Sequence, residues 1–244
     1  MRAIRVAVVC AVLSCISAFA FAADTIRIAF IDPLSGPFAN IGEMEVRLFQ
    51  YAIDLVNSRG GVLGGAKLEL TTFDNKANPQ ESLLVLKQAT DQGIRFITQG
   101  NSSAVALALS DAVTKHNARN PNETVLYLNY AAVDPALTNE RCSFWHFRFD
   151  ADADMKMSAL TDTIAAKTSI KRVYLINQDY SFGQAVARAA RAMLAKKRPD
   201  VSIVGDDLHP LGKVKDFAFM LQRLRHLVQI PSLPEIGATT SRCW

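Results

Sequence analysis

Short apolar segments alternate with longer amphipathic segments along the chain from residue 25 onward. The short segments are rich in β-branched residues, as strands are, and the longer ones repeat apolar residues every three or four positions, as helices do. We predict strands at residues 25–31, 67–73, 95–98 and 125–129, and helices at residues 43–59, 79–92 and 103–117. Strands and helices in this alternation indicate a parallel, doubly wound sheet.

The same spacing predicts which helix faces are buried. The expected inner residues are Val46, Phe49, Ile53 and Val56 in the first helix, and Leu83, Leu84, Leu86 and Ala89 in the second.

The pattern restarts near residue 150. After a short extended link at residues 143–149, we predict a helix at 152–167, a strand at 172–177, a helix at 182–197 and a strand at 202–208. A second α/β unit therefore follows the first. Two such units that face one another form a cleft at the carboxyl ends of their strands, where α/β sheets bind ligands.

The first residues have the form of an export signal. Arg2 and Arg5 precede an apolar stretch at residues 6–21, and Ala20 and Ala22 supply the small residues that a signal peptidase reads. We predict cleavage after Ala22 and a periplasmic location. The alternatives are an uncleaved membrane anchor or a lipoprotein modified at Cys15.

Composition and charge exclude several classes of protein. Half of the residues are hydrophobic and 20% are charged, which is ordinary for a globular chain. The net charge of +4 falls to +2 without Arg2 and Arg5, and no run of like charges stands out, so we expect no nucleic-acid partner. Cys142 and Cys243 remain after cleavage, and no cysteine or histidine has the spacing of a metal site.

Two glycine-containing segments invite a search for an anion site. The stretch at residues 60–65 follows a predicted helix and precedes a strand, so it is a helix stop and turn and not a phosphate loop. Gly100, Asn101, Ser102 and Ser103 instead follow a strand and open a helix. This turn is either a carboxylate-binding corner or a simple helix cap, and one residue can serve both purposes.

No arrangement of residues suggests covalent catalysis. The four histidines lack a metal-ligand spacing, and no GxSxG or Ser/His/Asp pattern is present. Asp150, Asp152 and Asp154 alternate near a helix start, where a cation site is one interpretation and helix-start acids are the better one. We therefore expect a protein that is not an enzyme and that needs no cofactor and no metal.

A series of motifs occurs in a recognisable order: FIDPLSGPFANIGEMEV, NSRGGVLGGAKLEL, FDNKANPQESLLVLKQATDQGI, GNSSA, NYAAVDPALT, CSFWHFR and NQDYSFGQ. From Thr25 to about Ala218 the chain resembles the leucine/isoleucine/valine-binding proteins, the type I periplasmic binding proteins of bacterial ABC importers. The resemblance implies two Rossmann-like doubly wound α/β lobes that close on a small solute, and a monomer that meets an inner-membrane ABC permease. A ligand-sensing regulatory protein of the same fold is the alternative.

The resemblance also implies where the ligand lies. The expected ligand-binding residues are Ile41, Asn101, Ser102, Ser103, Ala131, Ala132, Val133 and Phe182. Val133 stands where amino-acid binders tend to have threonine, Ile41 replaces an aromatic residue, and Phe182 lacks a phenolic hydroxyl. These departures suit a less polar carboxylate, such as an aromatic acid, at least as well as an amino acid.

The resemblance ends near Ala218. We expect a signal peptide at 1–22, an N-terminal lobe at 23–147, a partial second lobe at 148–218 and an aberrant tail at 219–244. A different reading frame of the tail permits a family-like helix, strand and turn, which predicts a frameshift and makes a selected Cys142–Cys243 disulfide implausible. An incomplete second lobe predicts exposed sheet edges, an uncovered apolar face and impaired binding. The tail still has helical spacing up to Pro231.

Overall fold

The computed structural model describes residues 25–228. The predicted signal peptide, its cleavage site after Ala22, the alternative modification at Cys15, and Cys243 lie outside the described residues. Within residues 25–228, no helix combines the length and the apolar character that a membrane crossing needs.

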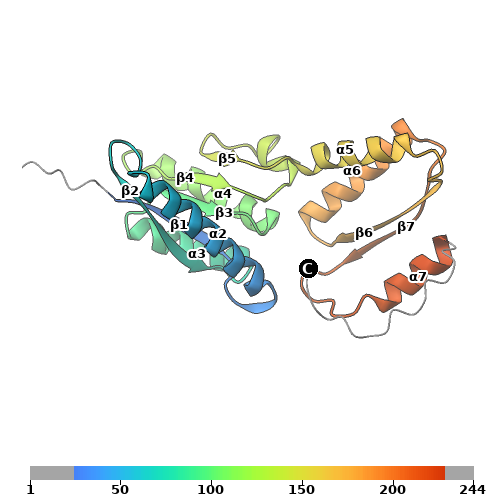
Figure 1. The fold of residues 1–244 in the computed structure, drawn as a ribbon, viewed down its shortest axis with the longest axis horizontal. Helices are drawn as coiled ribbons and strands as arrows, with labels where there is room; N and C mark the ends of the chain where they lie inside the picture. Colours follow the sequence, from blue (N-terminus) through green and yellow to red (C-terminus); the bar gives the residue numbers. More distant parts are fainter. Residues whose placement is uncertain (1–24, 229–244) are drawn as a thin grey trace, which may run out of the picture.

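The first unit is built on a parallel sheet of five strands (Figure 1). The strands are β1 (Thr25–Asp32), β2 (Lys67–Asp74), β3 (Phe96–Gln99), β4 (Leu126–Asn129) and β5 (His146–Arg148), in the spatial order β2-β1-β3-β4-β5. The predicted parallel, doubly wound sheet is therefore confirmed. The short segment at residues 146–148, which we expected to be only an extended link, adds the fifth strand beside β4.

Helices cover both faces of this sheet. Helix α2 (Ala39–Ser58) follows the short 3-10 helix η2 (Gly36–Phe38), while α3 (Pro79–Asp91) and α4 (Ser103–Arg119) pack against each other. Side chains of α3 and α4 join those of β1, β3 and β4 in one continuous buried core that includes Ile31, Leu86, Ile97, Leu109 and Tyr127. This core fixes the positions of the strand ends.

The buried face of α3 differs from the prediction. Leu86 and Ala89 are buried as expected, but Leu83 and Leu84 are 40% and 60% exposed. The residues that α3 buries are Ser82, Val85, Leu86 and Ala89. Their spacing of three, one and three positions is that of a single helical face, whereas Leu83 and Leu84 lie on either side of it.

The turn after α2 confirms the interpretation of the glycine-rich stretch. Gly61 has a φ of +82°, and a Cβ atom there would lie 2.2 Å from the carbonyl oxygen of Ala66. Only glycine adopts this left-handed backbone without strain. The stretch therefore reverses the chain between α2 and β2 and lies outside the α/β cleft region.

The second unit is a smaller three-layer arrangement (Figure 1). Helices α5 (Ala153–Ala166) and α6 (Ser181–Lys197) lie on one side of the parallel pair β6 (Arg172–Gln178) and β7 (Ser202–His209), and α7 (Ala218–Val228) lies on the other. The helical spacing expected up to Pro231 agrees with α7, as far as the described residues extend. The main buried apolar cluster of the second unit contains only Met157, Ala189 and Ala190.

Arg148 connects the two units where the chain passes from one to the other. Its guanidinium donates to the carbonyl oxygen of Asp134 at 3.1 Å and to the Asp152 carboxylate at 3.0 Å. The two side chains of this ion pair are only 6% and 9% exposed. Asp152 also caps α5 by accepting from the N–H of Met155, so it is a helix-start acid, as the better interpretation of the sequence held.

Candidate ligand-binding site

The turn after β3 is held from below by a buried carboxyl group. Asp32, at the end of β1, accepts hydrogen bonds from the backbone N–H groups of Gly100 (2.9 Å) and Asn101 (3.0 Å). Parallel strands end at the same edge of a sheet, which is why the end of β1 meets the turn that follows β3. The backbone of Gly100 passes close to Tyr130, since a Cβ atom on Gly100 would lie 2.7 Å from the tyrosine ring.

The turn after β4 is held in a similar way. The side chain of Asn129 accepts from the N–H groups of Ala131 (3.1 Å) and Ala132 (2.7 Å) and contacts the imidazole of His146 at 3.1 Å. Burial, followed by the charge of Arg148, lowers the pKa of His146 to about 4. The neutral imidazole therefore stays beside Asn129 at neutral pH without placing a charge under the turn.

Two serines stand at the start of α4. Ser102 is the N-cap residue of the helix, and its hydroxyl accepts from the N–H of Val105 at 3.4 Å. The Ser103 hydroxyl accepts from the N–H of Asp134 at 3.2 Å. Both contacts use hydroxyl lone pairs, so each hydroxyl retains its proton for a further acceptor. The N-terminus of a helix adds a partial positive charge that favours an anion.

These turns line a hollow of about 360 Å³ that reaches across to the second unit. It is lined by Gly100, Asn101, Ser102, Ser103, Ala131, Ala132, Val133, Asp150, Lys156, Tyr180 and Phe182. Seven of the eight residues expected from the sequence therefore come together. Ile41 does not line the hollow: it lies on the first turn of α2 and is 37% exposed.

The second unit contributes residues that the sequence reasoning missed. Tyr180 precedes α6, and its ring lies 6.0 Å from that of Phe182. Burial, followed by the charge of Asp134, raises the pKa of Tyr180 to about 12, so the phenol keeps its proton. The phenolic hydroxyl that Phe182 lacks is therefore supplied by Tyr180, two residues earlier in the chain.

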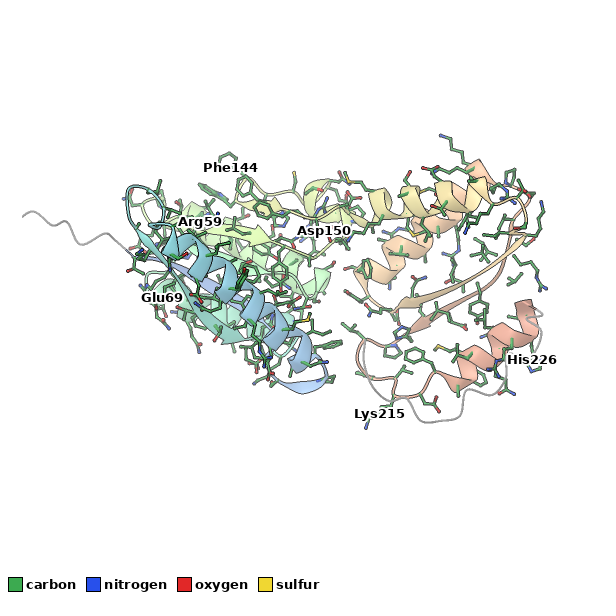
Figure 2. The ribbon with its side chains drawn as sticks, viewed as in Figure 1. Arg59, Glu69, Phe144, Asp150, Lys215 and His226 are labelled. Atoms are coloured by element: carbon green, nitrogen blue, oxygen red, sulfur yellow. The ribbon has the colours of Figure 1, made fainter. Side chains whose placement is uncertain are left out.

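Asp150 and Lys156 bring charge to the edge of the same hollow. Figure 2 shows Asp150 at the passage between the two units. Its carboxylate lies 2.5 Å from the ammonium group of Lys156, which projects from α5. Both side chains are about one third to one half exposed, so solvent screens this pair.

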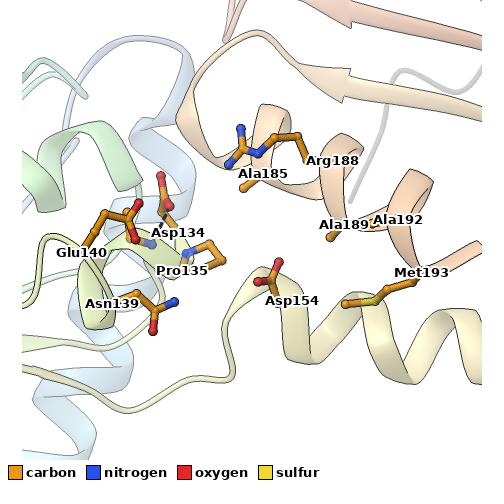
Figure 3. Close-up of a pocket in the computed structure, with 11 residues that line it drawn as sticks. Asp134, Pro135, Asn139, Glu140, Asp154, Ala185, Arg188, Ala189, Ala192 and Met193 are labelled. Carbon is orange, nitrogen blue, oxygen red and sulfur yellow. Dashed lines mark hydrogen bonds between the residues drawn. The ribbon is translucent and has the colours of Figure 1, made fainter. Parts of the chain in front are cut away.

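A second hollow lies between the units, beside the start of α5 (Figure 3). Asp134 and Glu140 approach it from the first unit, Asp154 from α5, and Arg188 from α6. The side chain of Asp134 is already hydrogen-bonded within its own loop, where it caps the 3-10 helix η3 (Pro135–Thr138) by accepting from the N–H of Ala136.

Two parallel α/β units with a hollow at the carboxyl ends of their strands define the class of two-lobed solute-binding proteins. The model of the periplasmic binding protein family matches residues 25–227, and the chain belongs to this family. The predicted type I periplasmic binding fold is confirmed.

Relatives of known structure or name support this assignment. The chain is 34% identical over 216 residues to the Leu/Ile/Val-binding protein homolog 4 of Brucella abortus (strain 2308), covering 88% of this chain and 51% of that protein. It is 33% identical to the leucine-, isoleucine-, valine-, threonine- and alanine-binding protein of Brucella ovis in its closed conformation, with a TM-score of 0.70 over 84% of this chain and 52% of that one.

A solute-binding protein of Rhodopseudomonas palustris in complex with benzoate shares the fold at 19% identity, with a TM-score of 0.71 over 84% of this chain and 53% of that one. The chain spans about half the length of the curated relatives it matches.

Proposed function

We propose that this chain is the periplasmic substrate-binding component of an ABC importer and that it binds a small carboxylate between its two lobes. The observation that carries the proposal is the hollow in which Ser102 and Ser103, at the start of α4, face Tyr180 and Phe182 of the second unit. Hydroxyl protons at a helix N-terminus suit a carboxylate, and the two rings suit its apolar part.

The charged pair in the hollow bears on the ligand class. An amino acid needs an acidic or carbonyl partner for its ammonium group, and Asp150 already has Lys156 as a partner. A carboxylate without an ammonium group has no such need. The aromatic wall and the paired acid therefore favour an aromatic or other organic acid at least as strongly as a branched-chain amino acid.

The partner and the location follow from the same proposal. A monomer with a cleavable signal peptide presents its closed form to an inner-membrane permease, and this function needs no covalent chemistry and no cofactor. Two structural neighbours are described as the substrate-binding protein and the solute-binding protein of ABC transporters, which favours import over a sensing role. The proposed lobes are residues 23–147 and 148–218, followed by the tail at 219–244, whose described part forms α7 against β6 and β7.

The test is binding of benzoate and of leucine to the full 244-residue chain, which we expect to be weak because the second unit has only a two-stranded sheet. Saturation-transfer NMR, which reports weak binding, detects the complex, and calorimetry quantifies it. We expect Ser102→Ala to weaken binding about tenfold to a hundredfold, because a hydrogen bond to a charged group contributes about 1.5–3 kcal/mol. Unchanged affinity in Ser102→Ala would show that Ser102 is only a cap, and no binding of either ligand to the wild type would contradict the proposal.

Asn78→Ala is the matched control. Asn78 caps α3 through the N–H groups of Gln80 and Glu81 and does not line the hollow. Loss of either cap costs about 1 kcal/mol of stability. Only Ser102→Ala should also reduce binding, so a parallel loss in both variants would assign the effect to stability alone.

A further inference from the structure

The carboxyl group beneath the serine turn does not act alone. Asp32 is completely buried, and its Oδ2 atom lies 2.6 Å from the hydroxyl of Tyr130. The same hydroxyl lies 2.7 Å from the Oε2 atom of Glu45, which reaches in from α2. The ring of Tyr130 is fixed between Phe30 and Phe49, with centroid distances of 6.2 Å and 5.2 Å. One phenol therefore bridges two carboxyl groups.

The two short contacts of this bridge need more protons than one phenol and two ionised acids supply. A phenol has one proton and donates it to one acceptor. The second oxygen–oxygen contact of 2.6–2.7 Å needs another proton, because two oxygens with lone pairs alone would repel at that distance. Burial raises the pKa of Asp32 to about 7, and burial and the neighbouring acids raise that of Tyr130. The phenol thus keeps its own proton, and the extra one resides on a carboxyl group.

The surroundings of Asp32 offer no positive charge to replace that proton. Among the residues described, the titratable groups that act on it are Glu45 from α2, and Tyr127 and Tyr130 from β4 and the turn after it. Asp74 stands beside Asp32 in the sheet register, and its carboxylate accepts from the N–H groups of Leu34 and Lys76. Lys76 is on the exposed side of that loop, where it pairs with Glu81.

The bridge reaches the hollow through Asn101. Its backbone N–H is held by Asp32, while its side-chain NH₂ group donates to Glu45 and lies 3.3 Å from the hydroxyl of Tyr130. Asn101 lines the hollow, next to the two serines. Loss of the shared proton would place a second negative charge under this turn, and like charges would then act both on the bridge and on a bound anion.

We propose that Asp32 is a positioning residue of the binding site: it shares one proton with Glu45 through Tyr130, and this proton holds Asn101 and its turn in the form that accepts a carboxylate. The inference rests on the proposed function. Above neutral pH the bridge loses the proton, and affinity for carboxylates falls. Asp32 and Tyr130 act on the binding site through Asn101, without contacting the ligand themselves.

The first experiment needs no ligand. Carboxyl carbons of the full chain, labelled with ¹³C at aspartate and glutamate, are followed by NMR from pH 4 to 9. We expect the Asp32 carboxyl group to titrate near pH 7 and this signal to be absent in Asp32→Asn, whose amide cannot ionise. Glu45→Gln is the second variant: it removes the competing acid, so the Asp32 signal should move down by about one pH unit or more. Titration of Asp32 below pH 5 in the wild type would overturn the shared proton.

The second experiment measures benzoate affinity over the same range. We expect the wild-type affinity to fall about tenfold as the proton is lost, which corresponds to a ligand-induced rise of about one unit in the pKa of the pair. The affinity of Asp32→Asn for benzoate should be nearly independent of pH over this range. Binding that is independent of pH in the wild type would overturn the positioning role and leave the proposed function standing. A titration near pH 7 with no binding of benzoate or leucine would overturn the proposed function and leave the shared proton standing.

Discussion

The two units of the molecule start from similar sequence patterns but differ greatly in burial. The last four residues of β1 are all buried, whereas every residue of β6 is at least partly exposed. Both strands are short and apolar. The difference arises because β1 lies between β2 and β3 inside a five-stranded sheet, while β6 has one neighbouring strand. Burial therefore depends on the number of neighbouring strands in the sheet, and not on the local pattern.

This difference divides the binding site into a firm half and a weaker half. The turns after β3 and β4 rest on a large core and on buried polar side chains. Tyr180 and Phe182 rest on a unit whose main cluster has three buried members. We expect the first unit to preserve its half of the site under conditions that loosen the second.

The largest expected effect is at the passage between the units. Arg148→Met leaves the Asp152 carboxylate buried without its partner, which typically costs about 3–5 kcal/mol. We expect a marked fall in the melting temperature and new proteolytic cleavage near residues 149–152. Lys87→Met, which removes an exposed ion pair with Asp91, should change stability by less than about 1 kcal/mol. Similar losses in both variants would contradict the role given to Arg148.

Core truncation should separate the two units almost as clearly. Ile97→Ala, in the central strand β3, should cost about 2–5 kcal/mol because it opens a cavity in the large core. Leu175→Ala, in the partly exposed strand β6, should cost less than half as much. Urea unfolding of each variant measures this difference, and equal losses would mean that the second unit is packed as well as the first.

The pH dependence of stability offers a finer comparison within the first unit. The pKa of Asp32 is about 7 in the folded protein and 3.8 in the unfolded chain, so its contribution is present at low pH and is lost as pH rises from about 4 to 7. His146 acts in the opposite direction: its pKa falls from 6.5 to about 4, so its contribution is lost as pH falls through that range. Each group changes stability by about 1.4 kcal/mol per pH unit within its window.

The two slopes should nearly cancel in the wild type between pH 4 and 6.5. Asp32→Asn removes one of them, so its stability should rise with pH in that range while the wild-type profile stays nearly flat. Chemical denaturation at several pH values measures both profiles. Parallel profiles for the wild type and Asp32→Asn would contradict the raised pKa of Asp32.

Much of the fold could be predicted from the sequence because its elements are long and periodic. The alternation of strands and helices, the restart near residue 150 and the glycine turn were all visible in local patterns. The strand at residues 146–148 was not, because three residues are too few to show a period, and only pairing with β4 defines it. The buried face of α3 was misassigned because leucines were weighed above Ser82, which a strict helical spacing would have included.

The site was predicted in part for the same reason. The serine turn was identified because it follows a strand and opens a helix, whereas the family resemblance supplied Ala131 and Ala132; both turns line the hollow. Applied to β1, the same rule would also have placed Asp32, an acid that ends an apolar strand, beneath Gly100. Glu45 and Lys156 had no such signal, because their roles depend on how α2 and α5 are oriented in three dimensions.

In the proposed function, the serine turn at the start of α4 and the aromatic residues at the start of α6 receive one small carboxylate. Amide NMR of the ¹⁵N-labelled full chain, titrated with benzoate, identifies the residues that the ligand contacts. We expect shift changes at residues 100–103 and 131–133 of the first unit together with residues 180–182 of the second. The same residues should show smaller changes in the Ser102→Ala variant at equal ligand concentration. Shifts that are absent from residues 100–103, or that cluster away from the hollow, would contradict the proposed function.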